Sequence, residues 1–392
     1  MVMLGTDMKV AETPKEGLKD YKKADPYAEW LKREGVKVYE KFYFPNLAKI
    51  ELGPWERKGG NGAVIHIANR HMPNDCHVVE IKPAGKSEPE HHMYELTVYV
   101  VSGRGATTVW QNGKDEKDEK RKQSFEWHAG SLFSIPLNAW YQNFNGSGDE
   151  PVRYIAVTNA PPMMRLFQDN EFIFNSDYTF RGRYSGEEEY FSGNGKLFNR
   201  RIWESNFIAN APDMLLYGWK ERGAGGINAM LEMANNNMKS HISEFPIGTY
   251  KKAHRHGPGA HLVLLSGSAG FSLVWTKEDR SDMIKCDWQT GSMVIVPSDN
   301  CYHQHFNSGT NRARYLALRP GDMGLNTPKG GGGENADRSL KEGGWQIEYE
   351  DEDREIHKIF EKEVAANGAT CKMKAFVPWC TGEVGPTSER DT

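Results

Sequence analysis

The sequence predicts an all-β protein in which one domain occurs twice. Residues 136–157 read P-L-N-A-W-Y-Q-N-F-N-G-S-G-D-E-P-V-R-Y-I-A-V, and residues 297–318 read P-S-D-N-C-Y-H-Q-H-F-N-S-G-T-N-R-A-R-Y-L-A-L. Upstream, the run from Gly85 to His91 matches the run from Gly248 to His254 at nearly the same offset. A repeat at one offset indicates a duplicated domain. The 40 glycines of the chain indicate that each copy is rich in turns.

Each copy contains short runs of β-branched and aromatic residues that are bounded by glycine, asparagine or proline. In the first copy these runs are residues 98–101, 107–110, 132–135 and 154–157, and in the second copy they are 262–265, 272–275, 293–296 and 315–318. Short strands at such regular spacing are typical of a β-sandwich or a β-barrel. We therefore expect two small barrels in tandem.

The helices are expected to be few and peripheral. Asp25 before Pro26 is a helix start, and Gly35 is a stop, so residues 26–34 should form a short helix. A second helix should end near Gly368. It is indicated by an apolar stripe at spacing i, i+3, i+4, i+8, made of Ile356, Ile359, Phe360 and Val364.

These patterns divide the chain into five parts. They are an N-terminal arm with a short helix (1–50), a first barrel (51–165), a connecting segment packed on the barrels (166–215), a second barrel (216–325) and a glycine-rich loop with the C-terminal helix (326–392). The loop itself is the run 328–333. Trp55-Glu-Arg in the first copy recurs as Trp219-Lys-Glu-Arg in the second, and such recurrence favours a structural role for both.

Composition excludes several classes of partner. The chain has 392 residues, with 49 Lys and Arg against 53 Asp and Glu, and this near balance without a basic stripe argues against nucleic acid. No apolar run reaches the ~18–20 residues of a membrane span, and the N-terminus lacks a signal-peptide core. Five cysteines at scattered spacings suit reduced thiols, so we expect a cytoplasmic protein, with a homo-oligomer left open.

Histidines are concentrated in the second copy. Six of the 13 lie between residues 241 and 305, and two pairs have the form H-x-H, namely His254/His256 and His303/His305. On a strand, positions i and i+2 share a face, and neighbouring strands lie ~4.8 Å apart. Histidines from two strands can therefore share one ion at ~2.1 Å per bond, and imidazole suits Fe, Mn, Ni, Cu or Zn.

These residues resemble the two sequence motifs of the cupin superfamily. The second copy has Gly248, five residues, His254-Arg-His256, then Gly267, and further on Gly291, five residues, Pro297, then His303, three residues, Asn307. The resemblance covers roughly residues 55–160 and 219–320. It implies a bicupin, with two double-stranded β-helix (jelly-roll) barrels and a metal site in the second barrel.

The second copy departs from the cupin pattern at the position of its usual glutamate. Counting four residues after His256 reaches His261, and counting three reaches Ala260. The resemblance therefore implies either a three-histidine site (His254, His256, His303) or a four-histidine site that includes His261. A neutral ligand set leaves the ion more positive, which favours anionic substrates and open positions for oxygen. Fe(II) is the expected ion, with Mn, Ni and Zn as alternatives.

The first copy departs further. Its motif contains His91, His92 and Glu95, but Tyr141 stands where the second copy has His303, and Asn143 where it has His305. The three polar residues could still contact an ion, although the strand-borne ligand is lost. We expect a degenerate barrel that contributes core and an interface.

Other residues are assigned by the same reasoning. His305 shares the face of His303 and has either an acid/base role at the substrate or a hydrogen-bonded place in the core. His241 is expected to be structural, and Arg255 to point away from the metal. Arg312 and Arg314 are expected to form a surface or interface pair in preference to a carboxylate clamp. Trp275 and Tyr302 are expected to fill the barrel in preference to lining a pocket.

The leading functional hypothesis is a non-haem Fe(II) dioxygenase that oxidises a small anionic organic substrate, aromatic in one version, with O₂. At the level of the fold the chain resembles the gentisate and hydroxynaphthoate ring-cleaving dioxygenases. The first alternative is a redox-neutral lyase, decarboxylase or isomerase that uses Mn, Ni or Zn as a Lewis acid. The second is a small-molecule-binding cupin without catalysis.

Overall fold

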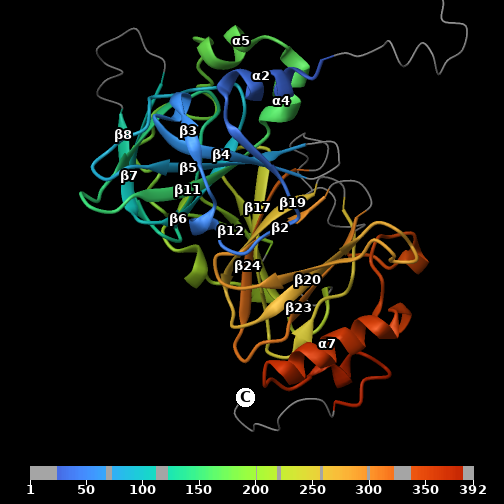
Figure 1. Ribbon diagram of the computed structural model, residues 1–392. Coiled ribbons are helices and arrows are strands. Elements are labelled where there is room, and N and C mark those ends of the chain that lie inside the picture. Colours follow the sequence, from blue (N-terminus) through green and yellow to red (C-terminus); the bar gives the residue numbers. More distant parts are fainter. Residues whose placement is uncertain are drawn as a thin grey trace, which may run out of the picture.

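The computed structural model confirms the predicted all-β architecture of two barrels with a few peripheral helices (Figure 1). It describes residues 24–67, 73–111, 122–199, 201–218, 222–256, 259–297, 301–321 and 337–382. The glycine-rich run 328–333 and the Trp219-Lys-Glu part of the recurring element lie outside the described residues. In the part of the chain that is described, no helix combines the length and apolar character needed to cross a membrane.

Each barrel has a large sheet and a small sheet. In the first barrel the large sheet runs β1 (Lys37–Glu40), β4 (Gly60–His66), β5 (Asp75–Ile81), β11 (Val152–Thr158), β6 (Leu96–Ser102), β9 (Leu132–Ile135) and β14 (Phe207–Ile208), with β3 (Gly53–Trp55) beside β4. Its small sheet runs β10 (Trp140–Asn145), β7 (Arg104–Trp110) and β8 (Gln123–His128).

The second barrel repeats this order. Its large sheet runs β12 (Lys196–Phe198), β13 (Ile202–Glu204), β16 (Ile227–Glu232), β17 (Met238–Phe245), β24 (Ala313–Pro320), β19 (Ala260–Ser266), β22 (Met293–Val296) and β2 (Tyr43–Phe44), with β15 (Tyr217–Gly218) beside β16. Its small sheet runs β18 (Thr249–Tyr250), β23 (Tyr302–Asn307), β20 (Gly270–Trp275) and β21 (Ile284–Trp288). All eight runs expected as strands lie within strands of the structure.

The two large sheets pack against each other and form the interface between the barrels. Along β11, Tyr154 and Ala156 face the interior of the first barrel, whereas Ile155 and Val157 enter a core shared with the second. Along β24, Leu316 and Leu318 belong to the same shared core. Because both faces of these strands are buried, the sequence there is apolar without a polar alternation.

Short edge strands are exchanged between the barrels. β2 lies between β1 and β3 of the first barrel in the chain, yet Tyr43 and Phe44 pair with Val294 and Met293 of the second barrel. Conversely, β14 follows β12 and β13 of the second barrel in the chain but pairs with β9 of the first barrel. The exchange covers one edge of each large sheet, which would otherwise expose unpaired backbone groups.

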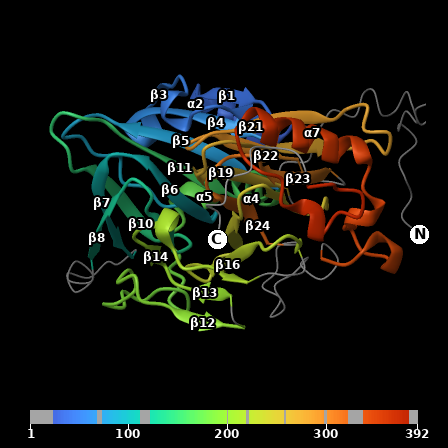
Figure 2. The same ribbon diagram turned by 90° about the horizontal axis from the view of Figure 1, so that it is seen from below.

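Helices cover the two far ends of the molecule (Figure 1), and the view from below shows α7 beside β23 of the second barrel (Figure 2). At the first barrel lie α2 (Pro26–Glu34), α4 (Ala160–Phe167) and α5 (Asn170–Asn175), and at the second barrel lies α7 (Arg354–Ala366). The two predicted helices are confirmed, including the cap from the Asp25 side chain to the Tyr27 amide and the left-handed Gly35. Single 3-10 turns are η1 (Leu47–Lys49), η2 (Glu56–Lys58), η3 (Ala211–Asp213), η6 (Leu340–Glu342), η7 (Tyr349–Asp351) and η8 (Met373–Ala375).

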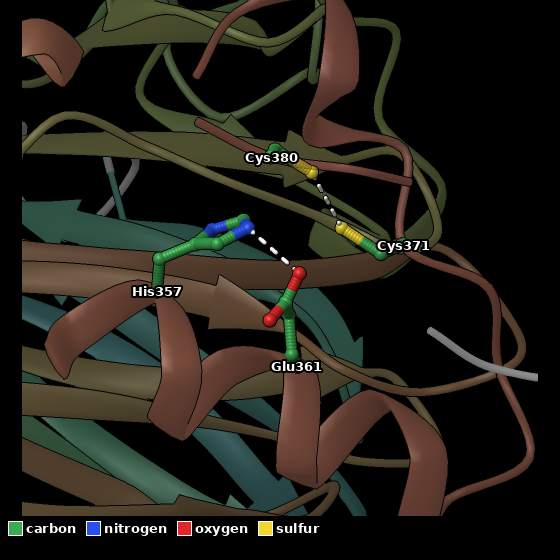
Figure 3. A group of neighbouring side chains, drawn as sticks. All are labelled: His357, Glu361, Cys371 and Cys380. Atoms are coloured by element: carbon green, nitrogen blue, oxygen red, sulfur yellow. Dashed lines mark hydrogen bonds and ion pairs between the residues drawn. The ribbon is translucent and has the colours of Figure 1, made fainter. Parts of the chain in front are cut away.

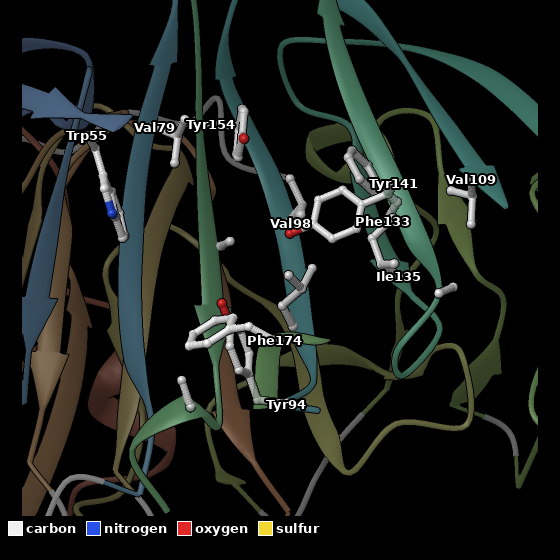
Figure 4. Close-up of a cluster of buried hydrophobic side chains, with 14 of the residues drawn as sticks. Trp55, Val79, Tyr94, Val98, Val109, Phe133, Ile135, Tyr141, Tyr154 and Phe174 are labelled. Atoms are coloured by element: carbon white, nitrogen blue, oxygen red, sulfur yellow. The ribbon is translucent and has the colours of Figure 1, made fainter. Parts of the chain in front are cut away.

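The interiors of the two barrels differ in character. The first is filled by large apolar side chains, among them Trp55, Tyr94, Phe133 and Phe174 (Figure 4). The second has a smaller apolar core and holds a group of buried histidines. The first barrel also buries polar side chains, among them His91, His92 and the Lys58–Glu90 ion pair, but the group of three convergent histidines lies in the second barrel.

Candidate metal centre

Three histidines converge inside the second barrel. One ring nitrogen each from His254, His256 and His303 lie within 4.8 Å of one another. His303 stands on β23, whereas His254 and His256 lie in the irregular segment between β18 and β19 and not on a regular strand. Two backbone hydrogen bonds, of 3.1 and 2.9 Å, tie His254 to His303 and bring the H-x-H segment beside the strand.

The outer ring nitrogens of two of these histidines are held by backbone carbonyls. Nδ1 of His254 lies 3.2 Å from the carbonyl oxygen of Lys252, and Nδ1 of His303 lies 3.3 Å from that of Cys301. A carbonyl can only accept, so Nδ1 carries the hydrogen and Nε2 keeps its lone pair. This is the arrangement by which proteins orient histidine as a metal ligand. The residues present therefore fit a divalent ion.

Burial keeps these imidazoles neutral. It lowers the pKa of His303 to about 3, and it lowers the pKa values of His254 and His256 well below their usual range. The positive charge of Arg222 and the neighbouring imidazoles add to the effect at His254 and His256. Neutral imidazole is the form that binds metal, so protons do not compete for the site near neutral pH.

His305 belongs to a hydrogen-bond chain that both barrels share. Nδ1 of His305 lies 2.8 Å from Oγ of Ser272, which accepts from the indole of Trp288. In the first barrel the indole of Trp127 donates to Thr107, and Thr107 donates to Asn143, the counterpart of His305. The repeated chain shows that this bond serves the barrel core. His305 also lies beside the candidate ligands, with its ring centre 5.4 Å from that of His303.

His261 does not join the other three histidines. Its Nδ1 lies 3.0 Å from the side-chain amide of Asn74 in the first barrel. The reason is the alternation along β19, where Ala260, Leu262 and Leu264 face the interior and Val263 faces the shared core. His261 therefore points at the first barrel, and the inward position holds an alanine.

The corresponding residues of the first barrel each have another partner. His91 bonds to Asn138, and His92 stacks on Tyr94 and lies 3.1 Å from the hydroxyl of Tyr141. The carboxylate of Glu95 pairs with Arg183 at 2.6 Å. Among the described residues these three do not form a metal-binding group.

The remaining expectations concern arginines and aromatic residues. Arg314 and Arg312 both form ion pairs with the carboxylate of Glu244. Arg255 stacks over Tyr302 at 5.1 Å, and Tyr302 stacks on the buried Trp275. His241 is partly buried against Tyr315, with its Nδ1 among the buried side-chain atoms that have no hydrogen-bond partner.

Two buried basic residues near the centre were not identified from the sequence. Nζ of Lys251 lies 4.6 Å from the ring centre of Phe245 and 3.4 Å from the hydroxyl of Tyr315, and burial lowers its pKa well below its usual range. Arg222 is buried and pairs with Asp337 at 2.8 Å. Arg222 occupies the place of Lys58, which pairs with Glu90 in the first barrel. The recurrence of the Trp55 and Trp219 elements was interpreted as purely structural. It was the pattern in the sequence that could have indicated Arg222.

Comparisons with known proteins give fold-level similarity. No protein family model and no curated protein matches the chain. Solved structures that are similar to it include the oxalate decarboxylase of Bacillus subtilis at pH 4.6, with 13% identity, a TM-score of 0.46, and coverage of 72% of this chain and 76% of that one. A second is an oxalate decarboxylase structure described by its substrate binding mode and a reaction specificity switch, with 13% identity, a TM-score of 0.46 and coverage of 72% and 77%.

Proposed function

We propose that His254, His256 and His303 hold one divalent metal ion and that the protein is an enzyme acting on a small organic anion. The observation that carries the proposal is the convergence of three neutral ring nitrogens within 4.8 Å inside the barrel. An ion bound at ~2.1 Å requires nitrogen separations of about 3–3.5 Å, which small side-chain adjustments provide. Three protein ligands leave positions open for a substrate, as catalytic sites require.

The surroundings favour an anionic substrate. The ligands are neutral, so the full charge of the ion is uncompensated, and Arg222 adds positive charge that lowers the pKa values of His303 and His305. No carboxylate belongs to the three-histidine group in the described residues. A carboxylate or a developing enolate would therefore be stabilised here more than in water.

The same field favours redox-neutral chemistry. An ion with neutral ligands, near the positive charge of Arg222, is held in its divalent state because a further positive charge would be repelled. When bound, the ion supplies a Lewis acid and a template for substrate oxygens. Lys251 would attract the substrate carboxylate, and His305 would hold or transfer a proton beside it. We therefore place a lyase or decarboxylase first.

An Fe(II) dioxygenase is the second candidate. It is favoured by the absence of a carboxylate among the three ligands, which leaves positions for both a chelating substrate and O₂. The two candidates share the site and the class of substrate. They differ in whether turnover consumes oxygen.

The first test is the metal content of the purified protein, measured by elemental mass spectrometry. We expect His303→Ala to lose the ion of the second barrel and His91→Ala, the matching substitution in the first barrel, to retain it. A wild type that binds no ion at this centre, even after reconstitution with Fe(II), Mn(II), Ni(II) or Zn(II), would refute the proposal.

The second test separates the two reactions. The reconstituted protein is supplied with small mono- and dicarboxylates and 2-oxo acids while dissolved oxygen and released carbon dioxide are followed together. Turnover without oxygen consumption supports the redox-neutral enzyme. Oxygen uptake in step with turnover would replace it by the dioxygenase.

A further inference from the structure

A second group of metal-ligating side chains lies at the far end of the second barrel. His357 and Glu361 stand on α7, and Cys371 and Cys380 lie in the segment that follows the helix (Figure 3). One ligand atom from each of the four lies within 4.8 Å of the others. His357, Cys371 and Cys380 are buried, and Glu361 is largely covered. None of the four takes part in the histidine centre described above.

The spacing within this group matches tetrahedral zinc. The two Sγ atoms are 3.6 Å apart, whereas tetrahedral coordination with ~2.3 Å zinc–sulfur bonds gives about 3.8 Å. A disulfide would hold the sulfurs at ~2.05 Å, and both cysteines are free. Nε2 of His357 and Oε1 of Glu361 are 3.0 Å apart, close to the ~3.3 Å that two ~2.0 Å bonds at a tetrahedral angle require.

The helix explains why two of the four side chains meet. Residues four apart on a helix lie on the same face, so His357 and Glu361 project together toward the cysteines. Figure 3 shows both side chains turned toward the two sulfur atoms. Nε2 of His357 is among the buried atoms without a hydrogen-bond partner, although the carboxylate is near.

The neighbours of His357 leave this nitrogen ready for a metal. The hydroxyl of Tyr250 donates to Glu352 at 2.7 Å and lies 3.0 Å from Nδ1 of His357. When Glu352 is ionised and takes the one hydrogen of the hydroxyl, the hydroxyl accepts from Nδ1, and Nε2 then carries a lone pair. That lone pair lies 3.0 Å from the carboxylate of Glu361, and two such acceptors need a proton or a metal ion between them.

We propose that His357, Glu361, Cys371 and Cys380 form a structural zinc site, distinct from the candidate centre in the barrel. Two sulfurs, one imidazole and one carboxylate fill a tetrahedral shell, so no position is left for a substrate. Thiolate ligands select Zn²⁺ over Mg²⁺, Ca²⁺ and Mn²⁺. Binding displaces one proton from each thiol, forms four bonds to zinc and changes no oxidation state.

The site would fasten the C-terminal segment to the barrel. The amide of Lys372 donates to the carbonyl of Gly248 at 2.8 Å, and Sδ of Met373 accepts from the amide of Tyr250. Phe360 of α7 packs on the ring of Tyr250, with ring centres 4.8 Å apart. Zinc would cross-link α7 to the segment that makes these contacts, and so hold both against β18.

The experiment is zinc and cobalt binding by the full-length protein, purified under reducing conditions. We expect one equivalent of zinc beyond that bound by the barrel. We expect Co²⁺ added to metal-free protein to give the absorption of tetrahedral cobalt with thiolate charge transfer. Cys371→Ser should lose both signals, and Cys286→Ser, a buried cysteine of β21, should keep them.

Two further variants separate failure to fold from failure to bind. Glu361→Gln changes a partly exposed side chain, and we expect at least a tenfold loss of zinc affinity with the far-ultraviolet circular dichroism unchanged. His303→Ala should retain this zinc, whatever becomes of the ion in the barrel. Protein that binds no thiolate-ligated metal, or in which Cys371 and Cys380 form a disulfide under reducing conditions and exclude zinc, would overturn the proposal.

Discussion

Replacing Glu352 by glutamine should remove a large part of the pH dependence of stability near neutrality. Glu352 is buried between α7 and β23, where its carboxylate accepts from the hydroxyl of Tyr250 and from the side-chain amide of Gln304. Burial raises its pKa from 4.5 to about 7, and the two hydrogen bonds offset the rise only in part. The folded protein therefore holds a proton that the unfolded chain releases at lower pH.

The size of the effect follows from the shift. Because the folded-state pKa is raised, the stabilisation from the protonated carboxyl is fully present below about pH 4.5 and is lost as the pH rises through about 7. At ~1.4 kcal/mol per pKa unit, a shift from 4.5 to about 7 corresponds to about 3 kcal/mol. Glutamine has a similar shape and does not titrate.

The assay is urea unfolding of wild type and Glu352→Gln, in one fixed metal state, from about pH 4 to about pH 8. We expect the wild type to lose about 3 kcal/mol relative to the variant over this range. Glu350→Gln, an exposed carboxylate on the same turn, is the control and should track the wild type. If the wild type and Glu352→Gln kept a constant difference, the pKa of Glu352 would be the same in the folded and the unfolded chain, and the reasoning would fail.

Three further predictions concern packing and charge. Gly248→Ala should lower the free energy of unfolding by about 3 kcal/mol. The reason is that Gly248 has a φ of +65° and an added Cβ would lie 1.9 Å from the carbonyl oxygen of Thr370. Gly53→Ala, at a glycine with open space around it, should lower it far less. Arg314→Met should cost about 3 kcal/mol by leaving Glu244 buried without its close partner, whereas the exposed Arg312→Met should change stability by under about 0.5 kcal/mol in the same denaturant assay. Lys251→Met should raise the KM for an anionic substrate at least tenfold, whereas Lys252→Met, at a more accessible lysine, should leave the KM unaltered. Equal KM values for the two variants would show that Lys251 does not bind the substrate.

The fold could be predicted because the sequence pattern that indicates it extends over many residues. A duplicated pattern of about 100 residues fixes the number of barrels, and apolar runs bounded by turns locate most of their strands. The exchange of β2 and β14 could not be predicted, because each strand has only two residues and pairs with the barrel farther along or back in the chain. The helices α4 and α5 were also missed, since the aromatic, glycine-rich sequence around them gives no clear helical stripe.

The candidate centre was predicted in part. The spacing of His254, His256 and His303 was the signal, but the regular strand assumed for the first two is an irregular segment held by its bonds to His303. His261 was considered because counting four residues after His256 reaches it, yet the face it occupies depends on where β19 begins. A one-residue difference in that start decides between the interior and the barrel interface.

The hydrogen-bond network of the second barrel links its two polar sites. Gln304 lies on β23 between His303 and His305, and its amide donates to Glu352, which is bonded to Tyr250 and through it to His357. Side chains alternate along the strand, so Gln304 points to the face opposite the two histidines and contacts Glu352 there. The chain around Glu352, directly before α7, therefore supports the strand that carries His303 without entering the barrel. If these contacts were lost, β23 could shift and carry His303 out of place. A metal site on α7 can therefore affect the histidine centre without contacting it.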